Sequence, residues 1–281
     1  MSRVLIAGCG SVGTHLAKRL DAEGHKVWGL RRSAEPLPGR IQTIQADLCD
    51  ASSLGAIPDN LDAVIYTAGA SEFSEEAYEN AYVSGIKNLL EALRQEASTP
   101  KRILFTSSTA VYAQQDGETV DESSETSPEG FSGQAMLRAE ALLRASPIES
   151  VSLRLGGIYG PGRTALIDRV RRGEAKREAT TRYLNLIHVE DIVGALLHLM
   201  TLSGPAEVYV GVDSDPQPRN ELLSWIAEQL DVPEPPLTDG PDSQRPPRNR
   251  RCSNARLLAS GYRFHYPSCR EGYAELIRAA R

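Results

Sequence analysis

Three glycines close to the N-terminus, Gly8, Gly10 and Gly13, have the spacing of a turn that holds a phosphate group. The apolar run Val4–Ala7 precedes them and apolar residues at helical spacing follow, which predicts a strand, a tight turn and a helix. In such a turn the first glycine makes the bend, the second lets the backbone approach a pyrophosphate, and the third lets the helix pack closely on the strand. The N–H groups at the start of the helix would then favour an anion. The stretch therefore predicts a dinucleotide-binding turn.

Two arginines, Arg31 and Arg32, follow the second predicted strand, Lys26–Leu30. A fold that binds NAD in this way usually has an acidic residue about twenty residues past the glycines, where it accepts hydrogen bonds from the ribose 2′-hydroxyl. A guanidinium at that place can pair with a 2′-phosphate, which a carboxylate would repel. The arginine pair therefore favours NADP over NAD, and a solvated basic turn is the alternative interpretation.

Short apolar strands alternate with helices through the first two thirds of the chain. This predicts an α/β fold with a parallel sheet, because parallel strands need crossover connections. We expect strands at 4–7, 26–30, 41–48, 61–70, 101–112, 150–160 and 207–210, and helices after the glycines and at 52–57, 75–96, 133–143, 165–172, 191–202, 220–230 and 268–280. Ligands gather at the carboxyl ends of such strands. The predicted cofactor contacts at this edge are Gly8, Gly10, Ser11, Val12, Gly13, Arg31, Arg32, Asp47, Leu48, Ala68, Gly69, Thr106, Ser107 and Gly157.

Several stretches together resemble the motifs of the extended short-chain dehydrogenases/reductases, the NAD-dependent epimerase/dehydratase family. They occur in the family's order and spacing: Gly8–Gly13, Asp47–Leu48, Thr67–Ala70, Val83–Leu90, Ser107–Tyr112, Arg154–Gly162 and Leu186–Asp191. The resemblance covers nearly the whole chain and implies a Rossmann-type, doubly wound parallel sheet with a smaller C-terminal substrate domain. One departure is the glycine spacing, since extended members usually have GxxGxxG.

The larger departure concerns catalysis. Members of the family use a tyrosine followed four residues later by a lysine, and no tyrosine of this chain has a lysine at that distance. When the chain is aligned with the family helix, Ser132 stands at the place of the tyrosine and Met136 at that of the lysine. Tyr82 takes the place of the family's asparagine, and of the usual four residues only the serine, Ser108, remains. The chain is thus similar to atypical short-chain dehydrogenases with a degenerate Tyr/Lys motif.

Ser108, Ser132 and Tyr112 are the candidates for catalysis. Ser108 could donate a hydrogen bond to a substrate carbonyl or hydroxyl. Ser132 is a weaker candidate, because a serine hydroxyl without a neighbouring base is a poor acid. Packing is the alternative role for Tyr112. The five histidines are scattered without the spacing of metal ligands, so no metal site is expected.

The alternating pattern ends near Arg163. We expect a dinucleotide-binding domain at 1–162 and 183–212, and a smaller substrate-side domain at 163–182 and 213–281. The stretch Arg245–Arg251 holds four arginines in an acidic chain. Arginines of this domain clasp the diphosphate in members that act on sugar nucleotides, so the resemblance implies Arg163, Arg248 and Arg251 as substrate contacts. A solvated loop is the alternative.

Composition limits the classes of partner. With 281 residues, a net charge of −6 and a pI near 5.5, the chain is not expected to bind nucleic acid, which is held mainly by clustered positive charge. No run approaches the ~18 apolar residues of a membrane span. Four cysteines without a CxxC pair suggest a reducing compartment. We therefore expect a soluble, cytoplasmic protein that takes a small-molecule substrate, and a homodimer is a further possibility.

Two hypotheses for function follow. The first is an NADP-dependent oxidoreductase, or an epimerase/dehydratase-like enzyme, that transfers hydride on a small polar or sugar-like substrate. The second is a catalytically inactive protein that binds NAD(P) as a sensor. A sugar-nucleotide epimerase that uses substitute residues is a weaker variant of the first.

Overall fold

The computed structural model describes residues 1–95, 99–180, 182–238 and 249–280. Contacts between Cα atoms divide the chain into two compact units. Unit 1 comprises Met1–Val111, Thr126–Arg154 and Val193–Tyr209, and unit 2 comprises Tyr112–Glu125, Leu155–Ile192 and Val210–Arg281. The units differ in part from the predicted domains, because 112–125, 155–162, 183–192 and 210–212 group with the C-terminal part of the chain, whereas 193–209 groups with the N-terminal part as expected.

A seven-stranded sheet forms the centre of unit 1, in the order β12-β7-β5-β4-β1-β2-β3. The apolar runs at its centre are buried on both faces, as expected for parallel strands covered by helices on either side. The β1–β2, β1–β4, β2–β3 and β4–β5 pairs are parallel. The strands are β1 (Arg3–Ala7), β2 (Lys26–Arg31), β3 (Gln42–Gln45), β4 (Ala63–Tyr66), β5 (Arg102–Ser108), β7 (Glu149–Leu155) and β12 (Val208–Gly211).

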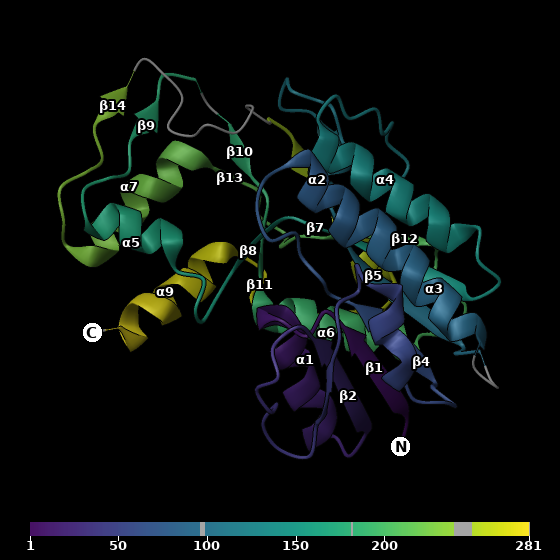
Figure 1. Ribbon diagram of the computed structural model, residues 1–281. Coiled ribbons are helices and arrows are strands. Elements are labelled where there is room, and N and C mark those ends of the chain that lie inside the picture. Colours follow the sequence, from purple (N-terminus) through teal and green to yellow (C-terminus); the bar gives the residue numbers. More distant parts are fainter. Residues whose placement is uncertain (96–98, 181, 239–248, 281) are drawn as a thin grey trace. The chain divides into compact units, whose positions relative to one another are not determined.

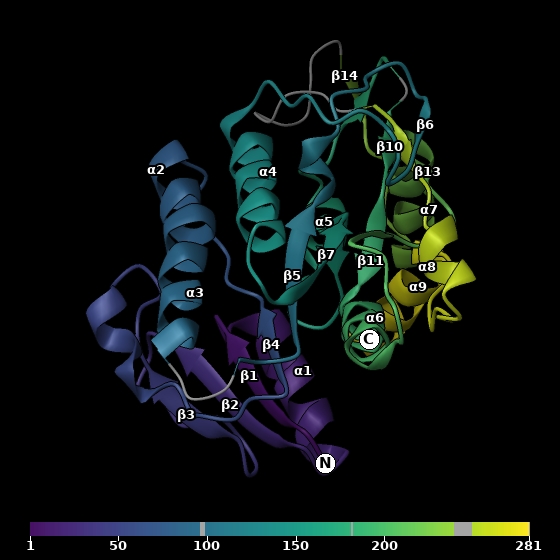
Figure 2. The same cartoon turned by 90° about the vertical axis from the view of Figure 1, so that its right-hand side faces the viewer.

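Helices cover the two faces of this sheet. Figures 1 and 2 show α3 and α4 side by side on one face, and α1 and α6 on the other. The helices of this unit are α1 (Ser11–Ala22), α2 (Glu75–Tyr78), α3 (Gly85–Gln95), α4 (Phe131–Arg144) and α6 (Val189–Thr201), whose first residues belong to unit 2. Together with the strand order, this is the doubly wound arrangement that the sequence predicts.

Several predicted elements differ in detail. The strand expected at 150–160 is divided into β7 of the large sheet and β8 (Gly157–Tyr159), which belongs to a separate two-stranded sheet. The helix expected at 52–57 is a 3₁₀ helix, η1 (Ala51–Ala56), and the strand expected at 101–112 ends at Ser108, followed by the 3₁₀ turn η3 (Thr109–Val111). The helix expected at 75–96 is divided by a π-helical segment, η2 (Glu79–Ser84). Here the Tyr66 hydroxyl of β4 donates to the carbonyl oxygen of Ala81, an oxygen that in a regular helix accepts only from a backbone N–H of the helix itself. Local periodicity does not encode that contact.

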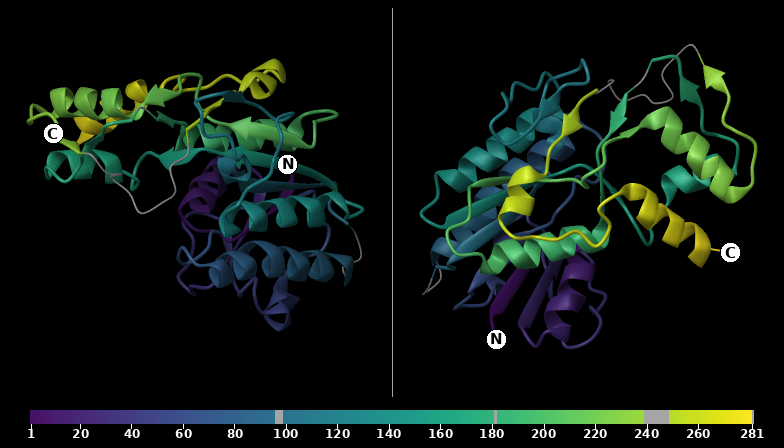
Figure 3. Two further views of the ribbon diagram at one scale, coloured as in Figure 1. Left: turned by 90° about the horizontal axis from the view of Figure 1, so that it is seen from above. Right: turned by 180° about the vertical axis from the view of Figure 1, so that it is seen from behind.

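Unit 2 is built from small paired strands and helices around its own apolar core. Helices α5, α7 and α9 pack together there, with Tyr159, Leu222, Leu223 and Ile226 among the buried residues. Figure 3 shows the yellow C-terminal helix α9 close to the green helix α7. The helices are α5 (Ala165–Arg171), α7 (Arg219–Leu230), α8 (Ala255–Ala259) and α9 (Cys269–Ala279). The paired strands are β6 (Thr119–Val120) with β15 (Arg251–Cys252), β8 (Gly157–Tyr159) with β11 (Leu186–His188), β9 (Arg177–Glu178) with β14 (Leu237–Thr238), and β10 (Tyr183–Leu184) with β13 (Gln217–Pro218).

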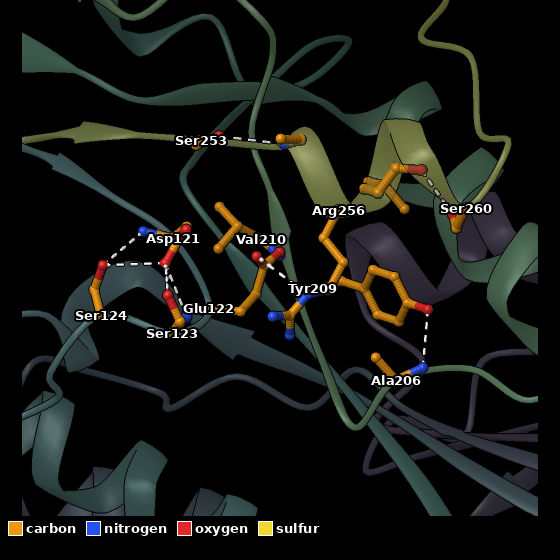
Figure 4. A network of polar contacts seen from close by, with 12 residues as sticks. Asp121, Glu122, Ser123, Ser124, Ala206, Tyr209, Val210, Ser253, Arg256 and Ser260 are labelled. Atoms are coloured by element: carbon orange, nitrogen blue, oxygen red, sulfur yellow. Dashed lines mark hydrogen bonds and ion pairs between the residues drawn. The ribbon is translucent and has the colours of Figure 1, made fainter.

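A buried carboxylate ties two segments of unit 2 together. The Glu122 side chain accepts the Val210 backbone N–H at 2.7 Å, and the Arg256 Nε lies 3.5 Å from its other oxygen (Figure 4). The contact joins the loop after β6 to the start of the last segment and to α8. Among the described residues, no helix has the length and apolar character needed to cross a membrane.

Candidate functional site

The turn after β1 depends on two of its three glycines for its shape. Gly8 has a φ of +84°, and a Cβ built there would lie 2.4 Å from the Cα of Ala68. A Cβ on Gly13 would lie 2.7 Å from the Thr67 Oγ1 and 3.0 Å from the Ile6 side chain. Only glycine therefore allows this turn to close against the loop after β4 and allows α1 to pack on β1.

The second glycine borders open space. A Cβ on Gly10 would meet nothing nearer than the Gly8 carbonyl oxygen at 4.0 Å, and its φ of −88° lies outside the left-handed region. Gly10 is the N-cap of α1 and supplies no side-chain cap, so the first N–H groups of the helix, among them those of Ser11 and Val12, lack that partner. A ligand phosphate could approach the backbone here, and this place fits a pyrophosphate.

Arg31 and Arg32 lie at the carboxyl end of β2, beside this turn. Burial raises the pKa of the Cys9 thiol, and the positive charge of Arg31 opposes that rise. Burial likewise raises the pKa of the Cys49 thiol, and Arg32 opposes it. Within the described ranges, neither guanidinium forms an ion pair. Both guanidinium groups therefore lack an ion-pair partner among the described residues, Arg31 next to the glycine turn and Arg32 near Cys49.

Asp47 and Leu48 follow β3 in a compact turn. The Asp47 carboxylate accepts the Cys49 N–H at 2.9 Å, and the Asp47 N–H donates to the Ser53 hydroxyl at 3.0 Å. The Asn88 side chain donates to the Leu48 carbonyl at 2.9 Å. These bonds fix the loop after β3. In the next loop, Ala68 lies against Gly8 and is followed by the exposed Gly69.

The end of β5 is anchored by a buried polar network. The Ser107 hydroxyl donates to the Glu140 carboxylate at 2.7 Å, and Arg154 makes two bonds to that carboxylate, at 2.7 and 3.0 Å. Glu140 and Arg154 are almost wholly buried, so their charges compensate each other away from water. Ser107 is thus engaged with α4, whereas Thr106 donates to the Tyr66 carbonyl. This pair could not be predicted from the sequence, because nothing in the spacing of Glu140 and Arg154 signals it.

Ser108 is the half-buried residue at the end of β5, and its hydroxyl oxygen accepts the Ala110 N–H at 3.1 Å. In the first turns of α4, Ser132 is 4% exposed and Met136 2% exposed. Arg138 follows Met136 by two residues in α4, which corresponds to a rotation of roughly 200° about the helix axis. It accordingly points elsewhere and pairs with Glu79 on the surface.

Tyr82 also belongs to this part of the unit, although it was not predicted as a site residue. Its hydroxyl oxygen accepts the backbone N–H of Ala70 at 3.4 Å, in the loop after β4. Its ring lies among those of Tyr78 and Phe105, with centroids at 5.3 and 6.4 Å. The signal in the sequence was a tyrosine at a place where the family has another polar residue.

Comparison with known proteins decides the family. The model of the NAD-dependent epimerase/dehydratase family matches residues 4–211, about three quarters of the chain. The chain belongs to this family.

Individual members of the family show similarity along most of the chain. A solved structure from Methylobacillus flagellatus, assigned to the NAD-dependent epimerases/dehydratases, is 37% identical, with a TM-score of 0.83 and coverage of 100% of this chain and 99% of that one. The dTDP-6-deoxy-L-talose 4-dehydrogenase (NAD(P)(+)) of Kitasatospora kifunensis is 30% identical, over 84% of this chain and 82% of the relative. The human epimerase family protein SDR39U1, solved with NADPH, shares the fold at 22% identity, with a TM-score of 0.82 and coverage of 98% and 99%.

The remaining predicted residues of this epimerase/dehydratase family member lie in unit 2. Tyr112 is fully buried, Gly157 is exposed in β8, and Arg163 is exposed, with its N–H bonded to the Gly160 carbonyl. Arg248 lies outside the described residues.

The arginines around β15 differ in environment. Arg251 is exposed, donates to the Gly117 carbonyl at 2.9 Å and lies over the Tyr183 ring at 5.3 Å. Arg250 was not predicted as a site residue and is 3% exposed. It donates to the Gln114 carbonyl at 3.2 Å, and burial lowers its pKa. Among the described residues, no group of three or more His, Cys, Asp or Glu side chains is arranged to hold a metal ion.

Proposed function

We propose that this protein binds NADP(H) and acts as an oxidoreductase on a small polar or sugar-like substrate. The observation that carries the proposal is a glycine turn bordered by open space at Gly10, with Arg31 and Arg32 beside it and without ion pairs. Family membership supports an NAD(P) cofactor. The NADPH in the human relative and the dehydrogenase activity in the name of the Kitasatospora relative agree with it.

Each part of the turn has a role in holding the cofactor. The N–H groups at the start of α1 and the backbone at Gly10 would take the pyrophosphate, which the helix dipole favours. Arg31 and Arg32 would take the 2′-phosphate through charge-assisted hydrogen bonds. When bound, NADP(H) supplies the hydride donor or acceptor. Ser108 would orient a substrate oxygen through its hydroxyl.

Fluorescence titration with NADPH and with NADH tests the choice of cofactor. We expect NADPH to bind at least about tenfold more tightly, equivalent to about 1.4 kcal/mol, because one or two guanidinium–phosphate pairs are added. The double variant Arg31→Ala/Arg32→Ala should lose most of that preference and keep its affinity for NADH. Arg19→Ala is the matched control, because this arginine of α1 is exposed and pairs with Glu23. Equal affinities of the wild-type protein for both cofactors would refute the arginine argument.

The second candidate is an inactive protein that senses NADP(H). It is favoured by Ser132 and Met136, which are both buried and supply neither an acid group nor a positive charge at the positions aligned with the family's Tyr/Lys pair. The two functions differ in turnover. A protein that binds NADPH but never oxidises it with any carbonyl compound would be the sensor, whereas turnover that Ser108→Ala reduces would support the enzyme.

A further inference from the structure

Tyr82 stands in a segment whose helix geometry is unusual. It lies in the π-helix η2, and π-helical turns are rare and frequent at functional sites. Its ring is held between Tyr78 of α2 and Phe105 of β5, while α4 packs against the same segment. Three elements of unit 1 therefore fix the direction of this side chain, so that its hydroxyl reaches the loop after β4.

The hydroxyl of Tyr82 is anchored through its oxygen alone. The Ala70 N–H donates to that oxygen, and the hydroxyl hydrogen has no acceptor in the part of the chain that the structure describes. Tyr66 differs in this respect, because its hydroxyl donates a hydrogen bond to the Ala81 carbonyl oxygen. Ala70 follows by two residues Ala68, against whose Cα the glycine turn closes. A half-buried donor that no described protein group accepts from thus stands at the loop that borders the predicted cofactor edge.

Among the hydroxyl groups near this loop, the phenol of Tyr82 is a stronger acid than a serine hydroxyl. Its ordinary pKa is about 10, whereas a serine hydroxyl such as that of Ser108 needs a neighbouring base to take part in proton transfer. Burial raises the pKa of Tyr82, while the bond from Ala70 opposes the rise. Tyr82 therefore stays protonated at neutral pH and keeps a proton that it can donate.

We propose that Tyr82 is the proton donor of this site and serves the reduction of a carbonyl substrate. The Tyr82 O–H bond breaks and its proton forms the new O–H bond on the substrate oxygen, while the carbonyl carbon receives the hydride that NADPH supplies. The phenolate then regains a proton from solvent, so one NADPH and one proton are used for each alcohol formed. This inference rests on the proposed function, since it needs NADPH as the reductant.

Tyr82→Phe and Tyr209→Phe form the matched pair of variants for the test. Tyr209 of β12 also accepts a backbone N–H through its hydroxyl, from Ala206 at 3.0 Å (Figure 4). NADPH binding and NADPH-dependent reduction of benzaldehyde and glyceraldehyde are measured on the wild-type protein and both variants. Tyr82→Phe should bind NADPH as the wild type does and lose on the order of 100-fold or more in kcat, the usual contribution of a general acid. Tyr209→Phe should keep kcat.

A readout independent of turnover accompanies the kinetics. With 3-fluorotyrosine at position 82 or 209, the fluorine resonance of residue 82 should shift when NADP⁺ is added, and that of residue 209 should not. Wild-type protein that fails to bind NADPH would overturn the proposed function and, with it, the role of Tyr82. NADPH binding without reduction of either aldehyde would overturn the oxidoreductase function and the role of Tyr82 together. The role of Tyr82 alone would be overturned by full activity of Tyr82→Phe or by an unshifted resonance at residue 82.

Discussion

The turn after β1 and the first turns of α4 both belong to unit 1, yet they meet their functional requirements in different ways. In the glycine turn, the backbone itself forms the predicted binding surface, and Gly8 and Gly13 are needed for the chain to close at all. At the start of α4, function would depend on which side chains are present, and Ser132 and Met136 are both buried. One site is a consequence of the fold, and the other can change while the fold stays intact.

This difference separates binding from chemistry. Glycines that the packing requires persist whether or not a reaction takes place, so the glycine turn supports cofactor binding and says little about catalysis. A buried methionine packs well in place of a lysine, which would have to be desolvated there. The proton chemistry of such a protein must therefore be sought on another element, and Tyr82 of η2 is the donor that we propose.

Removal of the Glu140 carboxylate should have the largest effect. Glu140→Ala leaves Arg154 charged and buried and removes the acceptor of Ser107, so we expect a loss of about 3–5 kcal/mol in the free energy of unfolding, measured by urea denaturation. Glu207→Ala is the control. Glu207 pairs with Arg144 of α4, the helix that also holds Glu140, and this exposed pair should be worth less than about 1 kcal/mol. Similar losses in the two variants would show that α4 does not depend on its buried anchor.

Gly8→Ala should be the next most damaging change. It combines a left-handed backbone with a Cβ that would lie 2.4 Å from the Ala68 backbone, so we expect a loss of roughly 2–4 kcal/mol. Gly24→Ala separates the two causes, because Gly24 has nearly the same φ, +83°, with nothing within 4 Å of its Cβ position. It should lose only about 1 kcal/mol. If the two variants were equally stable, close packing at Gly8 would have no part in the effect.

Gly10→Ala should affect the ligand and hardly affect the fold. The added methyl group enters open space, so the free energy of unfolding, measured by urea denaturation, should stay within about 0.5 kcal/mol of that of the wild type. The same methyl group would stand where a pyrophosphate approaches the backbone, and NADPH affinity should fall about tenfold or more, equivalent to about 1.4 kcal/mol. Unchanged affinity would contradict the placement of the pyrophosphate at this turn.

The sequence predicted the fold of unit 1 well because its strands are continuous apolar runs and its first glycine turn has a local signature. It also indicated the family through motifs spread along the chain. What it missed depends on contacts between distant residues. The Glu140–Arg154 pair, the π-helical segment bonded to Tyr66 and the burial of Arg250 beside the exposed Arg251 are all set by tertiary packing. Short windows of sequence carry no record of such contacts.

The division of the chain limits how this protein can change during evolution. The backbone passes from one unit to the other after residues 111, 125, 154, 192 and 209, so unit 2 is assembled from three separate segments. Recombination at a single point, or at two, cannot exchange that unit for one from another protein. A chimera would need three simultaneous replacements, with α6 and β12 each containing a junction. Exchange of unit 2 as a whole is therefore harder to reach by recombination than substitution of individual residues within it.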